Sequence, residues 1–520
     1  MFKLSGKIIG ALTGVCAAVL FFAAVPAGQV KAAGVVGEQE PNDSIYTANS
    51  ITANTEYSGT ISKGDDYDYY KFTVPASGHL KFSVTASPVS YDNSYDVKFT
   101  FLDSEEEPII SKAVSKGKTF SIGLLKGTYY LKMSQYFYNG DYSFHYTFTK
   151  SEESFADTGK DNTMSGANDI SIGKTYKGMV AANDTLDYYK FTLKDPGTLS
   201  LIFNSGETIH NRILDTKGGV VYDPYNHSGE SRQSTYLSKG TYYLEVERRW
   251  DYYCDYSFST SFAKISLPKT ATVVCGDSVT LAVENRGSKD VEWKTSNSDI
   301  ATVSTDYSKK GTVKSLKAGP ATIYAKVDGV TLKCSVQVLY KDVTNSKDFW
   351  YAPTNYLTNK DIVKGYDKQT LFKPNNKCTR AQMVTFLWRL KGSPKPKATT
   401  TTFKDIKTNA YYYKAVVWAV EKGITTGVSK KKFNPSGVCT RAQTVTFLWR
   451  MAGKPKPASS KNKFTDINSS DYFYKAVLWA SGKKIVEGYK NNTFRPQNKC
   501  TRRQMVTFLY KYDKYVNGKG

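Results

Sequence analysis

The sequence predicts a multidomain protein, with all-β sandwiches in its N-terminal two thirds and a mainly α-helical trimer of repeats at its C-terminus. Three observations lead to this prediction. A chain of 520 residues is too long for one hydrophobic core. Two segments of about a hundred residues share the same aromatic blocks in the same order, a spacing typical of repeated domains. The last third contains a unit of about sixty residues three times.

The first 32 residues show the order of basic, apolar and small residues that is typical of a secretory signal peptide. Lys3 and Lys7 precede an apolar run over residues 8–25, and small residues around Ala32 offer a cleavage site. An uncleaved membrane anchor is the alternative. No later segment approaches the ~18 apolar residues that span a bilayer, so we expect no transmembrane helix after cleavage.

The N-terminal half repeats one β domain. Residues 68–73 (Asp-Tyr-Tyr-Lys-Phe-Thr) recur at 187–192, and residues 126–131 (Lys-Gly-Thr-Tyr-Tyr-Leu) recur at 239–244. Aromatic and β-branched residues alternate with polar ones between Gly, Asn and Asp turns, which indicates an antiparallel sandwich. The two copies are expected at residues 38–150 and 160–263.

The first copy resembles the bacterial pre-peptidase C-terminal domain. The resemblance is carried by Glu40-Pro41-Asn42-Asp43 and by residues 68–72 and 127–130. Relatives of this fold in secreted collagenases bind calcium and collagen. The resemblance therefore implies a calcium site built from oxygen ligands, and a solvated acidic turn is the alternative. The implied ligands are Glu38, Glu40, Asn42, Asp43 and Asp66.

Residues 264–339 form a further predicted all-β unit. Trp293 is followed by Ser296-Asn297-Ser298 and by Ala301-Thr302-Val303, a pattern that resembles the bacterial Ig-like domain of surface proteins. We expect Trp293 to be a core residue. Cys275 and Cys334 lie in this unit, and the sequence leaves open whether they pair.

The final third contains a Cys-Thr-Arg-x-Gln motif three times, with the arginines spaced 61 residues apart. A Gly turn and Phe-x-Pro precede each motif, and a helical pattern follows it. The cysteines of the motif are expected to be small buried hydrophobes that lie far from one another. The repeats are expected at residues 340–393, 403–453 and 464–514, and their motif cysteines are Cys378, Cys439 and Cys500.

This triplicate resembles the S-layer homology domain, whose repeats dock proteins on secondary cell-wall polysaccharide. Gln stands where the family usually has Glu, and Tyr356 and Arg503 also depart from the other two repeats. From residue 340 onward there are 36 Lys and Arg against 10 Asp and Glu, whereas the rest of the chain is nearly neutral. Export makes nucleic acid an improbable partner, so an anionic wall polysaccharide is expected.

Each motif also has a direct physical interpretation. The Thr and the Gln form a capping box, in which each side chain bonds the backbone of the other. An Arg in the first helical turn has the wrong sign for the helix dipole, and with free backbone N–H groups it could hold a carboxylate or phosphate. A salt bridge to Asp342, Asp405 or Asp466 is the alternative. The capping pairs are Thr379 and Gln382, Thr440 and Gln443, Thr501 and Gln504; the candidate polysaccharide-binding arginines are Arg380, Arg441 and Arg502.

Four further residues are candidates for polysaccharide contact. Trp418 and Trp479 could stack on sugar rings, although their spacing suits a helix core equally well. Lys414 and Lys475 occupy one helical position in two repeats, where they either add charge to a groove or are simply solvated.

The sequence does not predict an enzyme. It contains no His-Glu-x-x-His, no Gly-x-Ser-x-Gly and no complete Gly-x-x-x-x-Gly-Lys-Ser/Thr phosphate loop. The expected function is therefore a secreted cell-surface protein, anchored non-covalently to the wall, that displays β-sandwich binding or spacer modules. The alternatives are a secreted adhesin that binds extracellular matrix protein or glycan through its N-terminal sandwiches, and an unrecognised hydrolase.

Overall fold

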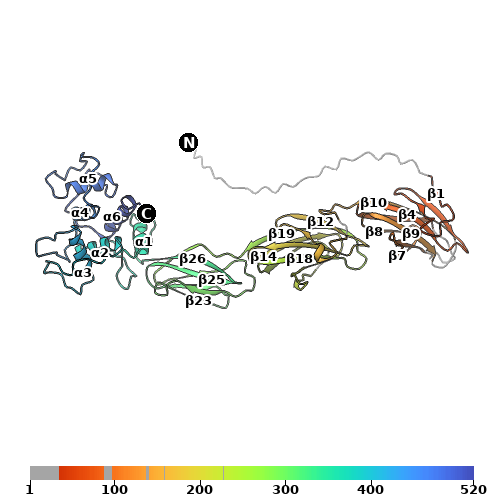
Figure 1. The fold of residues 1–520 in the computed structure, drawn as a ribbon, viewed down its shortest axis with the longest axis horizontal. Helices are drawn as coiled ribbons and strands as arrows, with labels where there is room; N and C mark the ends of the chain where they lie inside the picture. Colours follow the sequence, from red (N-terminus) through yellow and green to blue (C-terminus); the bar gives the residue numbers. More distant parts are fainter. Residues whose placement is uncertain (1–33, 87–95, 136–139, 157–158, 226–227, 520) are drawn as a thin grey trace, which may run out of the picture. The chain divides into compact units, whose positions relative to one another are not determined.

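A computed structural model describes residues 34–86, 96–135, 140–156, 159–225 and 228–519. The predicted signal peptide lies outside the described residues. The predicted fold class is confirmed, because β-sheets occupy residues 36–339 and six α-helices lie between residues 351 and 515 (Figure 1).

The first sandwich consists of two five-stranded sheets. One has the strand order β1-β3-β10-β5-β8, and the other has the order β2-β4-β9-β6-β7. Inward-facing aromatic residues such as Phe82, Phe99 and Phe144 are fully buried between them, as expected for strands with alternating polarity. The strands are β1 Val36–Gly37, β2 Asn49–Ser50, β3 Tyr57–Ile61, β4 Asp68–Val74, β5 Gly78–Ala86, β6 Asp96–Leu102, β7 Pro108–Ser115, β8 Thr119–Leu124, β9 Gly127–Gln135 and β10 Gly140–Lys150.

The second sandwich repeats this topology with one strand fewer among its described residues. Its sheets have the orders β12-β19-β14-β17 and β11-β13-β18-β15-β16. The strands are β11 Asn168–Asp169, β12 Thr175–Val180, β13 Leu186–Leu193, β14 Gly197–Ser205, β15 His210–Leu214, β16 Val220–Tyr222, β17 Gly229–Leu237, β18 Gly240–Glu247 and β19 Cys254–Lys264, and a short 3-10 helix covers Met164–Gly166.

The third β unit has a four-stranded sheet, β20-β26-β25-β22, and a three-stranded sheet, β21-β24-β23. Trp293 is buried, as expected, and its indole N–H donates to the Lys309 carbonyl at 3.2 Å. Cys275 and Cys334 are both free thiols. The strands are β20 Thr270–Val274, β21 Ser278–Leu281, β22 Glu292–Thr295, β23 Ala301–Thr305, β24 Gly311–Ser315, β25 Gly319–Val327 and β26 Val330–Leu339.

We call residues 340–514 the anchor region; it contains two helices per repeat. None of the helices among the described residues is both long and apolar enough to cross a bilayer. The predicted capping box is present at the start of the second helix in every repeat. The helices are α1 Tyr351–Asn359, α2 Arg380–Leu390, α3 Tyr413–Glu421, α4 Arg441–Met451, α5 Tyr474–Gly482 and α6 Arg502–Tyr515.

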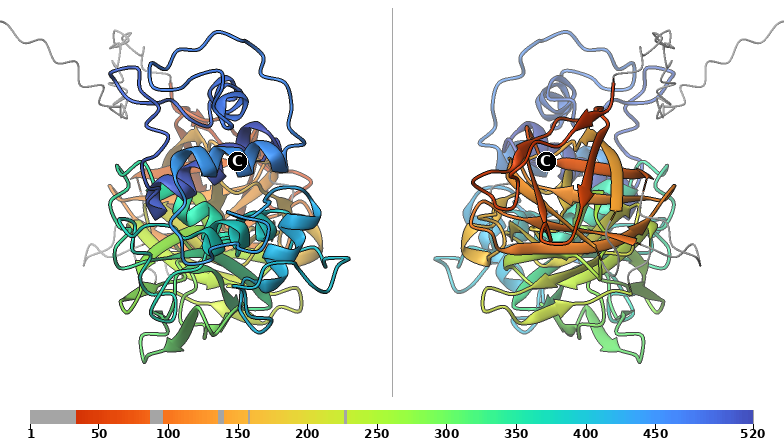
Figure 2. Two further views of the ribbon diagram at one scale, coloured as in Figure 1. Left: turned by 90° about the vertical axis from the view of Figure 1, so that its left-hand side faces the viewer. Right: turned by 90° about the vertical axis from the view of Figure 1, so that its right-hand side faces the viewer.

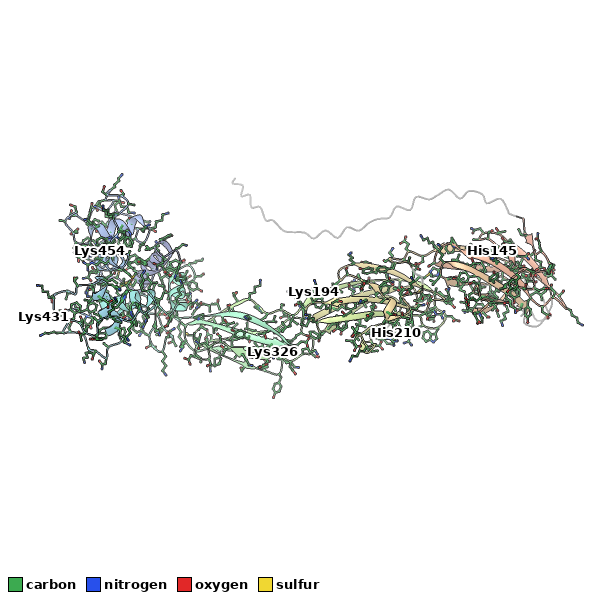
Figure 3. The ribbon with its side chains drawn as sticks, viewed as in Figure 1. His145, Lys194, His210, Lys326, Lys431 and Lys454 are labelled. Atoms are coloured by element: carbon green, nitrogen blue, oxygen red, sulfur yellow. The ribbon has the colours of Figure 1, made fainter. Side chains whose placement is uncertain are left out.

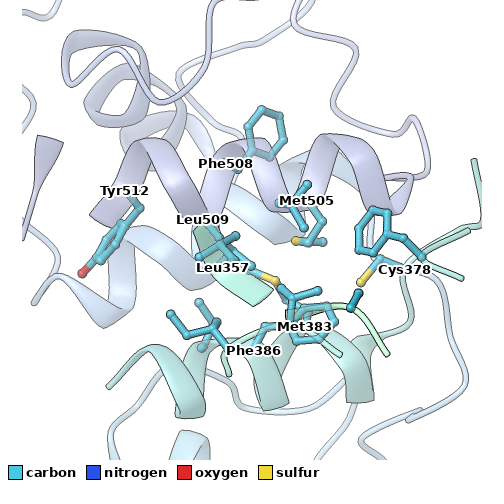
Figure 4. Close-up of a cluster of buried hydrophobic side chains, with 14 of the residues drawn as sticks. Leu357, Cys378, Met383, Phe386, Met505, Phe508, Leu509 and Tyr512 are labelled. Atoms are coloured by element: carbon cyan, nitrogen blue, oxygen red, sulfur yellow. The ribbon is translucent and has the colours of Figure 1, made fainter. Parts of the chain in front are cut away.

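The three repeats close into a ring. Helix α2 packs on α3 of the following repeat, α4 packs on α5, and α6 of the last repeat packs on α1 of the first. Figure 4 shows part of the shared core, in which Leu357 of α1 and Met383 of α2 lie beside Met505 and Leu509 of α6. The helices of this region are coloured from teal to blue in both views of Figure 2.

The three motif cysteines do not lie far apart, which corrects the expectation from their sequence spacing. The Cys378 N–H donates to the Cys500 carbonyl, Cys439 donates to Cys378, and Cys500 donates to Cys439, at 2.8–3.0 Å. All three thiols are free and fully buried. Spacing along the chain could not predict this, because closure of the ring brings equivalent positions to one centre.

Candidate functional sites in the anchor region and the first sandwich

The three motif arginines are buried, with only 2–5% of each residue exposed. Each guanidinium reaches into the next repeat around the ring. The Nε of Arg380 donates to the Phe433 carbonyl, and the last repeat closes the ring when Arg502 donates to the Phe372 carbonyl, both at 2.8 Å. Arg441 donates to Phe494 in the same way. Each guanidinium also lies over the ring of that phenylalanine, at 4.4–4.8 Å from its centroid.

The alternative interpretation, a salt bridge between each motif arginine and an aspartate, does not describe the structure. Asp342 instead accepts from the backbone N–H groups of Phe372 and Lys373, at 2.8 and 2.7 Å. The carboxylates of the other two repeats hold the matching turns, and within residues 340–519, all of which are described, no ion pair joins a motif arginine to them. The aspartate therefore fixes the turn whose carbonyl the arginine binds. Asp405 and Asp466 are the equivalent aspartates of the second and third repeats.

The backbone groups expected to hold an anion at the helix starts are also occupied. The N–H groups of Arg380 and Ala381 donate to the carbonyls of Gly437 and Pro435 in the next repeat, at 2.8 and 3.0 Å. The same pair of bonds recurs at Arg441 and Arg502. Since both the backbone donors and the guanidinium are bound within the protein, the geometry gives no support to direct polysaccharide contact by Arg380, Arg441 or Arg502.

The tryptophans are core residues in this structure. Trp418 and Trp479 are only 4% and 3% exposed, so neither presents a ring face on which a sugar could stack. Lys414 and Lys475 are exposed at the first turns of α3 and α5, and their contact with polysaccharide stays a prediction.

The structure identifies a set of exposed aromatic residues that the sequence reasoning missed. Phe349, Tyr411 and Tyr472 occupy one position in the three repeats, just before the first helix, and are 56%, 63% and 61% exposed. A large apolar ring left in water at the same place three times is not explained by packing. The sequence did contain a signal for these residues, a run of three consecutive aromatic residues in each repeat. The start of a helix cannot bury all three side chains of such a run.

Two of these aromatic residues lie within electrostatic range of a cation of the preceding repeat. Arg389 of α2 and Arg450 of α4 lie close enough to interact electrostatically with Tyr411 and Tyr472 respectively. Partial desolvation raises the pKa of each tyrosine although most of the residue is exposed, and the arginine acts in the opposite direction. In the last repeat Lys511 replaces the arginine, and it is paired with Glu487 at 2.8 Å.

A basic cavity of about 550 Å³ lies where the first and last repeats meet. Asp513 at its edge accepts from the Tyr356 hydroxyl at 2.8 Å and pairs with Lys360 at 3.2 Å. Tyr356 replaces the tryptophan of the other repeats, and this bond across the ring gives that departure a structural reason. The cations that line the cavity are Lys360, Arg389, Lys391 and Lys519.

The first sandwich brings together most of the predicted calcium ligands. Carboxylate oxygens of Glu38, Glu40 and Asp68 lie within 4.8 Å of one another, and so do those of Glu40, Asp43 and Asp65. Asn42 is fully buried beside them. The prediction of Asp66 as a ligand is wrong, because Asp66 is exposed and belongs to neither group. Asp65 and Asp68, on either side of it in the sequence, provide the carboxylates instead.

The electrostatics of this acidic cluster favour a bound cation. Burial and the neighbouring carboxylates raise the pKa of Asp65 to about 6 and that of Asp68 to about 8. Like charges held this close oppose ionisation, and a divalent cation with oxygen ligands would relieve the repulsion. The cluster therefore fits calcium chemically.

Comparison with known proteins agrees with the anchor geometry. Residues 339–384, 402–445 and 463–506 match the S-layer homology domain, and residues 257–338 match the bacterial Ig-like domain (group 2). The chain is 30% identical over 155 residues to the cellulosome-anchoring protein of Acetivibrio thermocellus, covering 28% of this chain and 34% of the relative. It is 32% identical over 128 residues to the middle cell wall protein of Brevibacillus brevis, covering 24% and 12%.

The solved structures that are similar include the pre-peptidase C-terminal domain of a collagenase from Bacillus anthracis. It shares 18% identity, covers 18% of this chain and 94% of that domain, and has a TM-score of 0.18. The chain spans about a third or less of the length of the two curated relatives named above. The matched repeats establish that this is a cell-surface protein with three S-layer homology repeats.

Proposed function

We propose that the anchor region docks the protein non-covalently on an anionic secondary cell-wall polysaccharide, while the β domains serve as displayed binding or spacer modules. The observation that carries this proposal is an exposed aromatic ring within electrostatic range of an arginine of the preceding repeat, seen with Tyr411 and Arg389 and again with Tyr472 and Arg450. An aromatic face suits the apolar side of a pyranose ring, and a guanidinium suits a carboxylate or phosphate on the same polymer.

The charge distribution supports the same partner. The region from residue 340 onward has 36 cationic against 10 acidic side chains, and a polyanion binds such a surface with an affinity that falls as salt rises. The buried motif arginines contribute indirectly, because they hold together the ring of repeats that carries the exposed aromatic residues.

Purified cell-wall sacculi test this proposal. The secreted chain is mixed with sacculi before and after acid extraction of the secondary polymer, and the bound fraction is measured by sedimentation. We expect binding to the untreated sacculi, loss of most binding after extraction, and release by increasing NaCl. Equal binding to extracted sacculi would show that the peptidoglycan itself is the partner.

We further propose that the chain has no catalytic activity of its own. The absence of the common nucleophile and metalloprotease motifs from the sequence supports this. Turnover of peptidoglycan, casein or polysaccharide by the purified protein would contradict it.

A cation site in the first sandwich is a second candidate function, supported by the crowded carboxylates and the raised pKa values of Asp65 and Asp68. Glu38, Glu40, Asp43, Asp65 and Asp68 would hold a calcium ion. Calcium titration of metal-free protein, followed by calorimetry, tests this directly: a Glu40→Gln variant should lose the binding heat.

A further inference from the structure

The second sandwich has a shallow cavity of about 280 Å³, and the function proposed above does not involve it. His210, the first residue of β15, lies in the wall of the cavity and is labelled in Figure 3. Tyr225 and Trp250 also line it, and they are 92% and 73% exposed. Two large aromatic side chains exposed to solvent beside a cavity indicate a ligand-binding surface.

Acidic and basic side chains both surround the His210 ring. Its Nε2 lies 2.7 Å from an Asp223 carboxylate oxygen, and its Nδ1 lies 3.2 Å from Glu247 and 3.0 Å from Arg249 Nη2. Arg249 is exposed at the rim, whereas His210 is mostly buried. The site therefore offers acceptors and donors within one small area.

The first sandwich shows that the fold does not need these groups. Strands β15 and β18 of the second copy are equivalent to strands β6 and β9 of the first. The cross-strand pair His210 and Glu247 corresponds there to the pair Lys98 and Ser134. The two copies keep the same sheet order around this position. The polar cluster is thus an addition specific to the second sandwich.

The backbone also holds Trp250 in an unfavourable conformation. Its φ of 51° lies in the left-handed region, which a bulky residue rarely adopts because it costs free energy that the surrounding structure must offset. The indole packs edge-on against Tyr252, with the ring centroids 5.7 Å apart. An exposed indole held in one orientation is suited to stacking against a flat ligand.

We propose that this cavity binds a neutral pyranose glycan. Sugar hydroxyl groups both donate and accept, so they match a site that presents Asp223 and Glu247 together with Arg249. The apolar face of a pyranose ring matches the indole of Trp250 and the phenol of Tyr225. Charges of both signs are present, so the site does not select a polyanion as the anchor region does. The second sandwich thereby gains a glycan-binding function separate from wall docking.

The test uses the full secreted chain and isothermal titration. The probes are the β-1,4-linked tetrasaccharides of glucose, xylose and N-acetylglucosamine, with tetragalacturonate and a collagen-like Pro-Pro-Gly peptide for comparison. We expect at least one neutral tetrasaccharide to bind. Trp250→Gly, which suits the left-handed backbone, and Tyr225→Ala should each weaken that binding about tenfold or more.

The control is Tyr307→Ala, which removes an equally exposed ring from the third β unit and should leave the affinity unchanged. Thermal unfolding shows whether each variant is folded, and Tyr225→Ala keeps the test decisive if Trp250→Gly does not fold. The proposal is overturned if no neutral tetrasaccharide binds, if both variants bind it as the wild type does, or if only the peptide or tetragalacturonate binds through Trp250.

Discussion

The duplicated sandwiches and the triplicated anchor region are both built by repetition, and in both the repeated residues turn inward. Asp68 and Asp187 accept a hydrogen bond from a buried tyrosine hydroxyl in their respective sandwiches. The three motif arginines are likewise buried and bind backbone carbonyls of the next repeat. Identity between copies within this chain therefore reports mainly on what holds each copy together.

The copies differ at the places where ligands would bind. Glu40 of the acidic cluster corresponds to Gly159 in the second sandwich, and Lys98 corresponds to His210. In the anchor region the exposed aromatic residues are the exception, because they recur in all three repeats although packing does not require them. A repeated residue that is exposed is thus a stronger functional signal than a repeated residue that is buried.

The largest expected effect comes from a buried arginine. Arg502→Ala leaves the carbonyls of Phe372 and Lys364 without their donor and opens a cavity, at a cost of about 3–5 kcal/mol in the free energy of unfolding. Thermal unfolding of the secreted chain should show the anchor region melting at a lower temperature. The matched control is Arg503→Ala, since Ala occupies that position in both other repeats; an equal loss of stability in the control would contradict this account.

The arginines that interact electrostatically with the exposed tyrosines should matter for wall affinity more than for stability. Arg389→Gln combined with Arg450→Gln is expected to weaken binding to sacculi about tenfold at low salt, because two charge-assisted contacts are lost. Lys511→Gln should have a smaller effect, since Glu487 already neutralises that lysine. Binding curves at several NaCl concentrations measure both, and equal losses from the two changes would show that only overall charge matters.

Metal-free protein should show a pH-dependent stability of the first sandwich. Burial and neighbouring carboxylates raise the pKa of Asp68 from 3.8 to about 8, so the folded state binds more protons than the unfolded state between these values. Its free energy of unfolding therefore falls as pH rises from about 4 to about 8. Calcium at pH 8 should restore the lost stability in calorimetry. Glu40→Gln should remove the calcium effect, and a calcium effect unchanged by this substitution would contradict the account.

The smallest effect is expected from the exposed lysines. Lys414→Ala combined with Lys475→Ala removes two solvated charges and should weaken binding to sacculi about twofold, with no change in unfolding temperature. A loss as large as that of the arginine variants would assign these lysines a direct contact.

Local chemistry predicted much of this molecule from the sequence. The alternation of aromatic and polar residues predicted the sandwiches, and the Thr and Gln spacing predicted all three capping boxes, because both depend on neighbours along the chain. Two features depend instead on closure of the ring of repeats. The Arg380 side chain reaches into the next repeat, and Cys378 bonds Cys500, 122 residues further along the sequence. No local pattern contains that information. The correct choice of Asp65 and Asp68 over Asp66 similarly required the strand geometry.

Sedimentation of a folded variant that lacks the exposed rings tests the wall-docking mechanism most directly. Tyr411→Ala combined with Tyr472→Ala is compared with the wild type on untreated and acid-extracted sacculi, after circular dichroism has shown equal unfolding temperatures. The account predicts an affinity for untreated sacculi at least tenfold below that of the wild type, with no difference on extracted sacculi. Wild-type affinity in the double variant would contradict it.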